Sequence, residues 1–507
     1  MSNARRVARN TLANWAGLVA NTLILLLLTP YVLGVLGKER FGVYVVAQQA
    51  LIFVNLLTLG MRAGMNRFTA RDVFAEDAER LNHTLSTVFL FHVGIGVVGL
   101  LIFAGLGLVA PSFFGIQRDF VRETVLLFAA VGLNFLLDLI GFTYRGLLVG
   151  HQRFDLLNVG MILQSLIRAG FVVAIFTLGW GTLGGFAVAV TASYCIALGY
   201  FWFVSHRIQP TLKIRLRGVT RESFREVLGF GVWNGIVQFG NVVTFAMPPL
   251  VVGRVLGADQ IVFFSIPFML ADRLRMVVVG MANTLAPIAA GTLVSGDRDQ
   301  FRSLIVTGTL AAATMCLPVG AILLVFCKPF LVLWMGDEFA WSWVVYGIVM
   351  IAMFGRITQA PTLHVLLGGG RIRGLAYVQL LTAVATVVLM IVLVTHTTWH
   401  VIAVAVGVTV PLFLSHTVFL PWYAARQMSL SLPHYLLRSY LPPLLATLPG
   451  VLLALLLNRV WPPTTWSILI VEGAASLGVS TVTAWSTCLD QSIRERLMRK
   501  VGMFFHA

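Results

Sequence analysis

Residues 12–44 read LANWAGLVANTLILLLLTPYVLGVLGKERFGVY. The run from Leu12 to Leu36 contains no charged residue, and it is long enough to cross a bilayer as one helix, since a crossing needs about 20 mostly apolar residues. Three arginines precede this run. It is too long for the apolar segment of a secretion signal, so we expect a retained first transmembrane helix.

The composition extends this interpretation to the whole chain. Of its 507 residues, 58% are hydrophobic and 11% are charged, whereas soluble domains average about 25% charged residues. A soluble fold is therefore excluded, because too little polar surface is available to face water. The net charge of +16 does not indicate nucleic-acid binding, since the basic residues lie in short connections between apolar runs, where they orient helices in the membrane.

Apolar runs of bilayer length recur along the sequence, and they predict an all-α polytopic membrane protein. The basic residues gather in alternate connections, which predicts that both termini are cytoplasmic. The tryptophans fall near predicted helix ends, as expected of an aromatic belt. We predict fourteen transmembrane helices, near residues 12–36, 42–62, 85–110, 121–145, 157–179, 183–204, 228–253, 261–285, 302–327, 341–365, 375–396, 400–423, 438–460 and 466–489.

An internal repeat relates the two halves of the chain. A shift of 220 residues, without gaps, superimposes Asn, Arg and Gly residues at membrane depth, which chance rarely achieves. Because the shift spans six predicted helices, an even number, the halves share one orientation. Parallel repeats of this kind are an architecture of transporters, with the substrate site between the halves. The matching pairs include Asn14 with Asn234, Asn21 with Asn241, Gly37 with Gly257, and Gly150 with Gly370.

The repeat predicts the organisation of the chain. Residues 1–205 form an N-lobe of helices 1–6, and residues 228–425 form a C-lobe of helices 7–12. Residues 206–227 form a linker with six Lys and Arg residues, which we expect on the cytoplasmic surface beside anionic lipid headgroups. Residues 426–507 contain helices 13 and 14, which have no counterpart in the first half, and a cytoplasmic tail.

Two stretches carry a resemblance to a known family. Asn10 to Tyr44 includes Asn14, Asn21, Thr29-Pro30 and Phe41-Gly42-Val43-Tyr44, and a later stretch runs from Arg145 to Asp155. They resemble polysaccharide exporters of the multidrug/oligosaccharidyl-lipid/polysaccharide (MOP) superfamily. The resemblance implies a MATE-like fold and a flippase for undecaprenyl-pyrophosphate-linked oligosaccharides, of the O-antigen or exopolysaccharide type, in the bacterial inner membrane. It also implies membrane lipids and other polysaccharide-assembly proteins as partners.

Ionisable residues within the predicted helices are the candidate site, because they are costly in a membrane. A surplus of arginine suits a phosphate-bearing substrate, since the guanidinium group donates two hydrogen bonds to phosphate oxygens at once. The candidate substrate-binding residues are Arg168, Arg273, Arg275, Arg356 and Arg62. The candidate ion-coupling residues are Asp138, Asp272 and Glu472.

Structural explanations compete with these roles. Asp272 and Arg275 are three residues apart on a helix and could neutralise each other. Arg62 is near a predicted helix end and could reach the interface. The asparagines at 14, 21, 234 and 241 could line a cavity, but interhelical hydrogen bonds explain them equally well.

We therefore expect a transporter and not an enzyme, working by alternating access without a cofactor, a metal or nucleic acid. A proton or a sodium ion could supply the energy, and the lipid tail of the substrate could lie along helices 13 and 14. The alternatives are an ion-coupled exporter of small molecules or drugs and a flippase for peptidoglycan lipid precursors. A membrane polysaccharide polymerase or ligase is disfavoured, because such enzymes need a large outer loop for the catalytic site.

Overall fold

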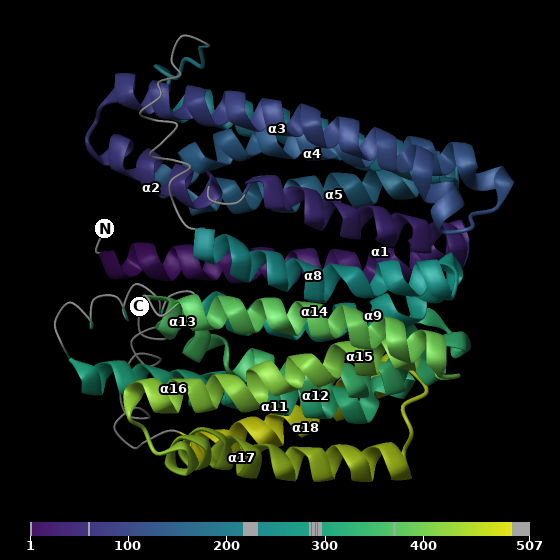
Figure 1. The fold of residues 1–507 in the computed structure, drawn as a ribbon, viewed down its shortest axis with the longest axis vertical. Coiled ribbons are helices and arrows are strands. Elements are labelled where there is room, and N and C mark those ends of the chain that lie inside the picture. Colours follow the sequence, from purple (N-terminus) through teal and green to yellow (C-terminus); the bar gives the residue numbers. More distant parts are fainter. Residues whose placement is uncertain are drawn as a thin grey trace. The chain divides into compact units, whose positions relative to one another are not determined.

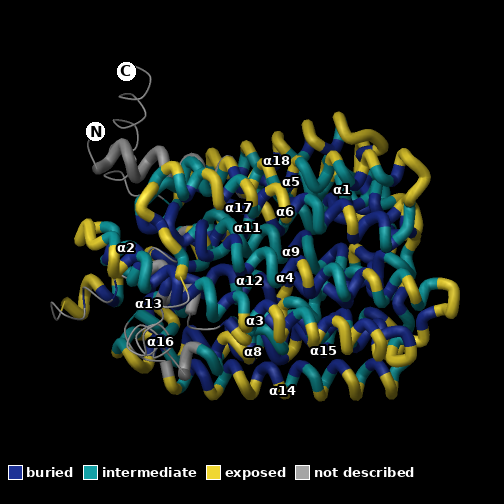
Figure 2. Tube along the Cα trace, turned by 90° about the horizontal axis from the view of Figure 1, so that it is seen from above, coloured by how far each residue is buried: buried dark blue, intermediate teal, exposed yellow. Residues whose placement is uncertain are grey.

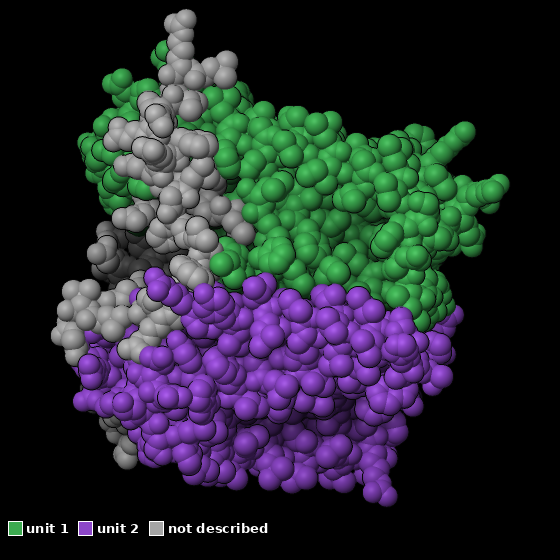
Figure 3. All heavy atoms as spheres, in the orientation of Figure 1, with its two compact units in different colours: residues 1–262 green, residues 263–507 purple. Residues whose placement is uncertain are grey.

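The computed structural model describes residues 3–58, 61–215, 232–282, 297–368 and 372–488, together with residues 285, 289 and 292. Within these residues every regular element is a helix and no strand occurs, which confirms the predicted all-α class. The chain forms two compact units, Met1–Val262 and Phe263–Ala507, coloured separately in Figure 3. The predicted lobe boundaries at residues 205 and 228 are a different division and stay a prediction.

Unit 1 consists of long helices joined by short turns. Helix α3 packs along α4, α4 and α5 pack on α6, and α1 packs on α5 and α8. The elements are α1 (Asn3–Val54), η1 (Asn55–Thr58), α2 (Met61–Phe74), α3 (Ala78–Phe113), η2 (Arg118–Phe120), α4 (Val121–Gly150), α5 (Phe154–Thr177), α6 (Leu183–Ile208), α8 (Val232–Val255) and η4 (Ala258–Gln260).

Helix α1 is two crossings joined at Gly37. Its 52 residues would extend about 78 Å as a straight helix, which is more than twice the hydrocarbon thickness of about 30 Å. Gly37 leaves helical geometry at φ 77° and ψ 168°, and the purple ribbon turns back on itself in Figure 1. Gly257, its partner under the 220-residue shift, has φ 107° and ψ 157°. Glycine adopts this backbone readily because it lacks a Cβ atom, so the repeat is present in the backbone.

Unit 2 contains the remaining helices, the first of which, α9, begins at the boundary between the units. Helix α11 packs on α12 and α17, α14 and α12 pack on α15, and α17 packs on α18. The elements are α9 (Ile261–Ala282), α11 (Arg298–Met335), η5 (Asp337–Ser342), α12 (Trp343–Thr358), α13 (Ala360–Gly368), α14 (Ile372–His396), α15 (Val401–Phe413), the π-helix η6 (Leu414–Phe419), α16 (Leu420–Met428), α17 (Leu432–Val460) and α18 (Trp466–Thr487).

Each of the fourteen predicted segments contains a helix. By length and hydropathy, twelve helices of the described chain are able to span a membrane. The two crossings of α1 count as one in this number, as Val19–Thr58. Helix α9 is not counted, and it carries Asp272, Arg273 and Arg275 within four residues. The protein is therefore a multi-pass membrane protein with the predicted helix order, including the C-terminal pair α17 and α18.

Several helices extend beyond the segments predicted from hydropathy. Helix α3 begins at Ala78 and not near residue 85, because the Asp77 carboxylate caps it by accepting a hydrogen bond from the Arg80 N–H at 2.9 Å. Helix α11 begins with the equivalent cap, in which Asp297 accepts from the Gln300 N–H at 2.9 Å. Such caps satisfy N–H groups that the first turn leaves free, so a helix can continue past the bilayer into water.

Helix α14 presents a regular apolar stripe to its surroundings. The stripe appears as repeated exposed positions along α14 in Figure 2. In water such a surface would be costly, whereas lipid tails accept it without cost. The exposed side chains of the stripe are Tyr377, Leu381, Val384, Val388 and Ile391.

The start of the predicted linker is bound to α3 and to the core of unit 1. The side-chain amide of Asn82 donates to the carbonyl of Thr211 at 3.0 Å and accepts from the N–H of Lys213 at 3.0 Å. Leu212, between them, is buried in the core cluster formed by α3, α4 and α6. Lys213 is exposed. This part of the linker therefore packs as an extended segment with apolar side chains inward, while residues 216–231 lie outside the described part.

A network of side-chain hydrogen bonds joins α17 to the rest of unit 2. The Tyr435 hydroxyl is 3.0 Å from the hydroxyls of both Thr309 and Thr362 and donates to Gln359 Oε1 at 3.0 Å. Gln359 Nε2 then donates to the Tyr440 hydroxyl at 2.9 Å. Because these groups are satisfied away from water, α17 is fixed in one position against α11, α12 and α13.

Candidate functional site

Helix α9 supplies three ionisable side chains within one turn. Arg275 Nε donates to the Asp272 carboxylate at 2.6 Å, and the two side chains are 24% and 23% exposed. The structure therefore contains the Asp272–Arg275 ion pair, which the sequence had suggested as the structural alternative to substrate binding. Asp272 is bound by an arginine and is not a free carboxylate.

Arg273 forms no ion pair with a carboxylate of the described residues. Its Nη1 group is 3.5 Å from the sulfur of Met276, a weak acceptor. Its Nε atom is buried and has no hydrogen-bond partner among the described residues. A partly buried guanidinium with unused donors is able to bind an anionic group, since binding would satisfy those donors.

Helix α12 and the π-helix η6 bring two further basic residues to the same region. Arg356 lies within electrostatic range of both Arg275 and Asp272. His416, on η6, is buried, lies within range of Arg356, and pairs through Nδ1 with the Ser415 hydroxyl at 2.8 Å. We call Asp272, Arg273, Arg275, Arg356 and His416 the arginine cluster. It contains three guanidinium groups and one carboxylate, a surplus of positive charge in a membrane protein.

The sequence analysis missed His416. A π-helix places side chains at angles that differ from those of the α-helical repeat, so periodicity gives no sign of where this histidine points. The only signal available was a histidine inside the apolar run that contains residues 401–423.

Arg168 belongs to unit 1, whereas Arg273, Arg275 and Arg356 belong to unit 2. On α5, the Nε atom of Arg168 is buried and has no hydrogen-bond partner among the described residues. The guanidinium group lies within electrostatic range of Tyr44 on α1 and Tyr194 on α6. Arg168 is thus the centre of a second polar group inside unit 1.

Asp138 completes this second group from α4. Its carboxylate accepts a hydrogen bond from Arg145 Nη2 at 2.7 Å, and both residues lie within electrostatic range of Tyr194. Asp138, like Asp272, is therefore paired with an arginine. Tyr44, Arg145 and Tyr194 were not among the predicted site residues, although Tyr44 and Arg145 lie in the two stretches that carried the family resemblance.

Glu472 differs from both aspartates. It lies on α18, is 5% exposed, and has neither carboxylate oxygen hydrogen-bonded to a described residue. Of the three predicted ion-coupling residues, only this one has no partner in the described part of the chain.

The asparagines that the structure describes take part in helix packing. Asn21 on α1 donates to the carbonyl of Gly17 at 2.9 Å and accepts a hydrogen bond from the Ser165 hydroxyl of α5. Asn241 donates to Gln238 on its own helix at 3.3 Å. The side chains of three further predicted residues lie outside the described part, namely Asn14, Arg62 and Asn234.

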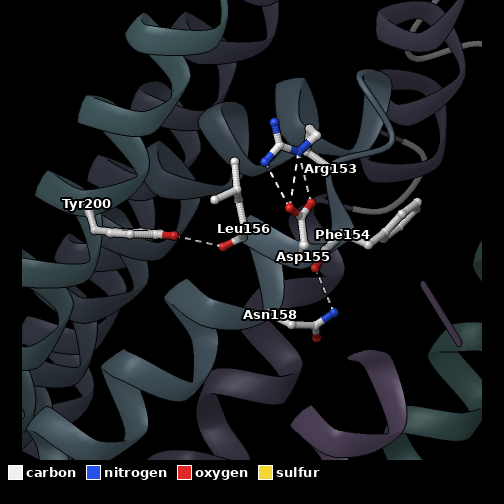
Figure 4. A network of polar contacts seen from close by, with 6 residues as sticks. All are labelled: Arg153, Phe154, Asp155, Leu156, Asn158 and Tyr200. Carbon is white, nitrogen blue, oxygen red and sulfur yellow. Dashed lines mark hydrogen bonds and ion pairs between the residues drawn. The ribbon is translucent and has the colours of Figure 1, made fainter. Parts of the chain in front are cut away.

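The loop between α4 and α5 is held by a compact polar network (Figure 4). Arg153 donates through Nε and Nη2 to the Asp155 carboxylate at 3.0 and 2.8 Å. The Tyr200 hydroxyl donates to the carbonyl of Leu156 at 3.1 Å, which fixes the start of α5 against α6. In the same loop, burial lowers the pKa of His151 despite an opposing hydrogen bond with Gln209 of the linker. These contacts set the position of a loop and form no substrate site.

The comparisons with known proteins agree with this fold. Residues 7–292, more than half of the chain, match the family described as "Polysaccharide biosynthesis protein". The chain is 21% identical over 503 residues to the "Uncharacterized membrane protein EpsK" of Bacillus subtilis, covering 97% of each chain. It is 22% identical over 351 residues to the "Putative O-antigen transporter" of Shigella flexneri, covering 69% of this chain and 81% of that protein.

Solved structures show the same architecture. An inward-facing multidrug resistance MATE family transporter of the MOP superfamily aligns with a TM-score of 0.71 at 16% identity, over 81% of this chain and 94% of that one. A MOP superfamily transporter from Pyrococcus furiosus aligns with a TM-score of 0.65 at 16% identity, over 84% and 95%. The predicted MATE-like fold is confirmed, and the chain belongs to the polysaccharide biosynthesis protein family of membrane proteins.

Proposed function

We propose that this protein is a flippase that moves a lipid-linked oligosaccharide, carried on phosphate or pyrophosphate, from the cytoplasmic to the outer leaflet of the bacterial inner membrane. The observation that carries the proposal is the arginine cluster. It holds three guanidinium groups against a single carboxylate, and Arg273 retains unused donors. A guanidinium group with unused donors at membrane depth is costly unless it binds an anion.

The chemistry of a pyrophosphate-linked substrate explains why the cluster contains arginine. A pyrophosphate group is anionic at neutral pH and offers several acceptor oxygens, which guanidinium groups bind with two parallel hydrogen bonds. Arg168 in unit 1 supplies a further guanidinium with a buried, unused donor. The family match to polysaccharide biosynthesis and the O-antigen name of the Shigella flexneri relative support a glycan as the cargo.

The proposed mechanism is alternating access without covalent chemistry. The sugar-phosphate head group enters from the cytoplasm and binds the arginines, while the polyprenyl tail stays in lipid. Two parallel halves then rock so that the head group reaches the other side, as in other transporters built from parallel repeats. Such a cycle has no catalytic residue and leaves the substrate unchanged, so the product is the same molecule in the outer leaflet.

The sign of the charge separates this proposal from its main rival. An exporter of cationic drugs needs carboxylates to bind its substrate, yet Asp138 and Asp272 are each bound by an arginine. Removal of an arginine from the cluster should leave such an exporter active, whereas it should impair a carrier of an anionic head group.

The test uses the purified full chain in liposomes that contain a fluorescent lipid-pyrophosphate-linked oligosaccharide. Exposure of the head group to an external glycosidase measures translocation. We expect Arg273→Gln, which leaves the Asp272–Arg275 pair intact, to slow translocation, because losing a hydrogen bond to a charged group costs about 1.5–3 kcal/mol. That range corresponds to roughly tenfold to hundredfold. The double variant Arg273→Ala, Arg275→Ala should be more severely affected.

The matched control removes two arginines elsewhere. Arg118 on η2 and Arg122 in the first turn of α4 are exposed and lie four residues apart. The variant Arg118→Ala, Arg122→Ala should translocate at the wild-type rate. Equal rates for the wild type, the control and both cluster variants would overturn the role of the cluster. A wild-type protein that flips a peptidoglycan lipid precursor but not this substrate would shift the proposal to that sibling function.

A further inference from the structure

Helix α18 contains a single ionisable residue, Glu472, six residues after Trp466. Six residues correspond to roughly 9 Å along a helix, so the carboxyl group lies inside the hydrocarbon layer and not at its surface. The neighbouring side chains Ile470 and Val471 are 63% and 67% exposed, as expected of a lipid-facing surface. Glu472 itself is 5% exposed and therefore faces the protein.

The buried side of α18 is a stripe with helical spacing that packs on α17 and α11. At one end of it, Leu469 packs in an apolar cluster with Ile322, Phe326 and Ala454. At the other end, the Ser480 hydroxyl donates to a carbonyl of α17, that of Thr447, at 3.4 Å. The stripe consists of Leu469, Glu472, Ser476, Ser480 and Ala484. Glu472 thus lies between an apolar cluster and a close contact of two helices.

No described group neutralises this carboxyl. Both oxygens of Glu472 and the hydroxyl of Ser476, one turn further along the same face, are buried and have no hydrogen-bond partner in the described chain. Helices α11 and α17 pack against α18 and carry charged and titratable residues. Among the described residues, none of these forms an ion pair with Glu472. They are Arg298, Asp299, Arg302 and Lys328, with Cys316 and Cys327, on α11, and His434, Tyr435, Arg438, Tyr440 and Arg459 on α17.

An isolated carboxylate in such surroundings takes up a proton, because the ionised form would cost far more than a neutral carboxyl group. Asp138 and Asp272, in contrast, each form an ion pair with an arginine. The structure therefore separates three acidic residues, which look alike in the sequence, into two carboxylates paired with arginines and one carboxyl group without a partner among the described residues.

We propose that Glu472 is the proton-binding site of this protein. The carboxyl group is protonated at neutral pH within the α17–α18 pair, and it exchanges its proton during the transport cycle, so that translocation responds to a pH gradient. The exchange is a simple equilibrium in which a carboxylate and a proton form a carboxylic acid. The protonated state of Glu472 is independent of what the protein transports, whereas the link to translocation rests on the proposed function.

The first experiment tests the protonated state without reference to transport. The full chain in liposomes at neutral pH is treated with an apolar carbodiimide, which modifies protonated carboxyl groups in apolar surroundings, and the modified peptide is identified by mass spectrometry. We expect modification at Glu472, none at Asp138 or Asp272, and loss of the modification in Glu472→Gln. An unmodified Glu472 overturns the proposal. Protection of Glu472 by sodium ions at constant pH also overturns it, since the site would then bind a metal cation.

The second experiment tests the link to transport with the glycosidase assay. The wild type should translocate faster in one direction of an imposed pH gradient. Glu472→Gln, which has the shape of the neutral acid but cannot exchange a proton, should lose the response to the gradient. An unchanged response in Glu472→Gln, or a wild type that flips but ignores the gradient, overturns the proton-coupling role. A wild type that does not flip the lipid at all overturns the proposed function, while the carbodiimide result still decides the state of Glu472.

Discussion

The polar residues of the membrane helices differ in how completely each is satisfied by its neighbours. Arg275 and Arg145 each hold an aspartate. Arg273 and Arg168 have a buried Nε atom with no hydrogen-bond partner among the described residues. The paired residues therefore stabilise the fold, while those with unused donors are the better candidates for substrate contact. This distinction depends on neighbours from other turns and helices. The sequence therefore identifies the residues but does not show which of them are paired.

The pair of Asp138 and Arg145 leads to a prediction about stability. We expect Arg145→Gln to lower the melting temperature in detergent, because it removes the partner of a partly buried carboxylate, with a cost of about 1–3 kcal/mol. The double variant Asp138→Asn, Arg145→Gln should recover part of the loss, since it removes the unpaired charge as well. The exposed Arg122→Gln is the control and should melt as the wild type does. A double variant less stable than Arg145→Gln would contradict a structural role for the pair.

At the scale of elements, the C-terminal helices are bound to unit 2 by close contacts. Helix α17 is fixed by the Tyr435 network, and Gly450 of α17 lies directly against the carbonyl of Ser476 and the hydroxyl of Ser480 on α18. The helix pair was predicted from hydropathy, but the position of its contact face was not. Three small or polar residues in the stripe of α18 make that face, and their partners come from helices distant in the sequence.

Gly450 provides the test of this contact. A Cβ atom at Gly450 would overlap Ser476 and Ser480, so Gly450→Ala should force α18 away from α17 and cost about 1–3 kcal/mol. Gly473 on α18 has open space around it, so Gly473→Ala should be neutral or slightly stabilising, since alanine favours a helix over glycine by about 1 kcal/mol. Thermal unfolding of both variants measures the difference. Equal melting temperatures would show that the two helices do not pack as described.

The start of the linker provides a second test at this scale. Asn82→Ala removes both hydrogen bonds to the backbone of residues 211 and 213, each worth about 1 kcal/mol. The segment should open more often, and trypsin should cleave after Lys213 or Arg215 roughly thirtyfold faster. Ser112→Ala, which removes an exposed hydroxyl from the last turn of α3, is the control. Unchanged cleavage in Asn82→Ala would argue that the buried Leu212 alone holds the segment.

At the scale of the whole molecule, the 220-residue repeat appears in backbone geometry as well as in sequence. The paired turns at Gly37 and Gly257 and the paired caps at Asp77 and Asp297 occur at equivalent positions. The sequence predicts six crossings between equivalent residues, so we expect these residues to lie on the same side of the membrane. This orientation distinguishes parallel halves from the inverted repeats of other transporters.

Single cysteines at equivalent positions test the orientation in intact cells. Glu79 and Asp299 form one exposed pair and Gln117 and Asp337 another, each separated by 220 residues. A membrane-impermeant maleimide should label Gln117→Cys and Asp337→Cys from outside, and Glu79→Cys and Asp299→Cys only after permeabilisation. The wild type, with its own cysteines, gives the background. Opposite accessibility of the two members of a pair would exclude parallel halves.

The amino-acid sequence was sufficient to predict the all-α membrane class, the order of the helices, the repeat and the surplus of arginine. It could do so because the bilayer requires long apolar segments and the positive charges mark their ends. The pairing of the charges, in contrast, is known from the three-dimensional structure and not from the sequence. Asp272 and Asp138 form ion pairs with arginines, whereas Glu472 has no partner among the described residues. His416 lies within electrostatic range of Arg356 because it is on a π-helix, which sequence periodicity does not predict. Such pairing depends on where helices far apart in sequence bring their side chains, and that is set by packing.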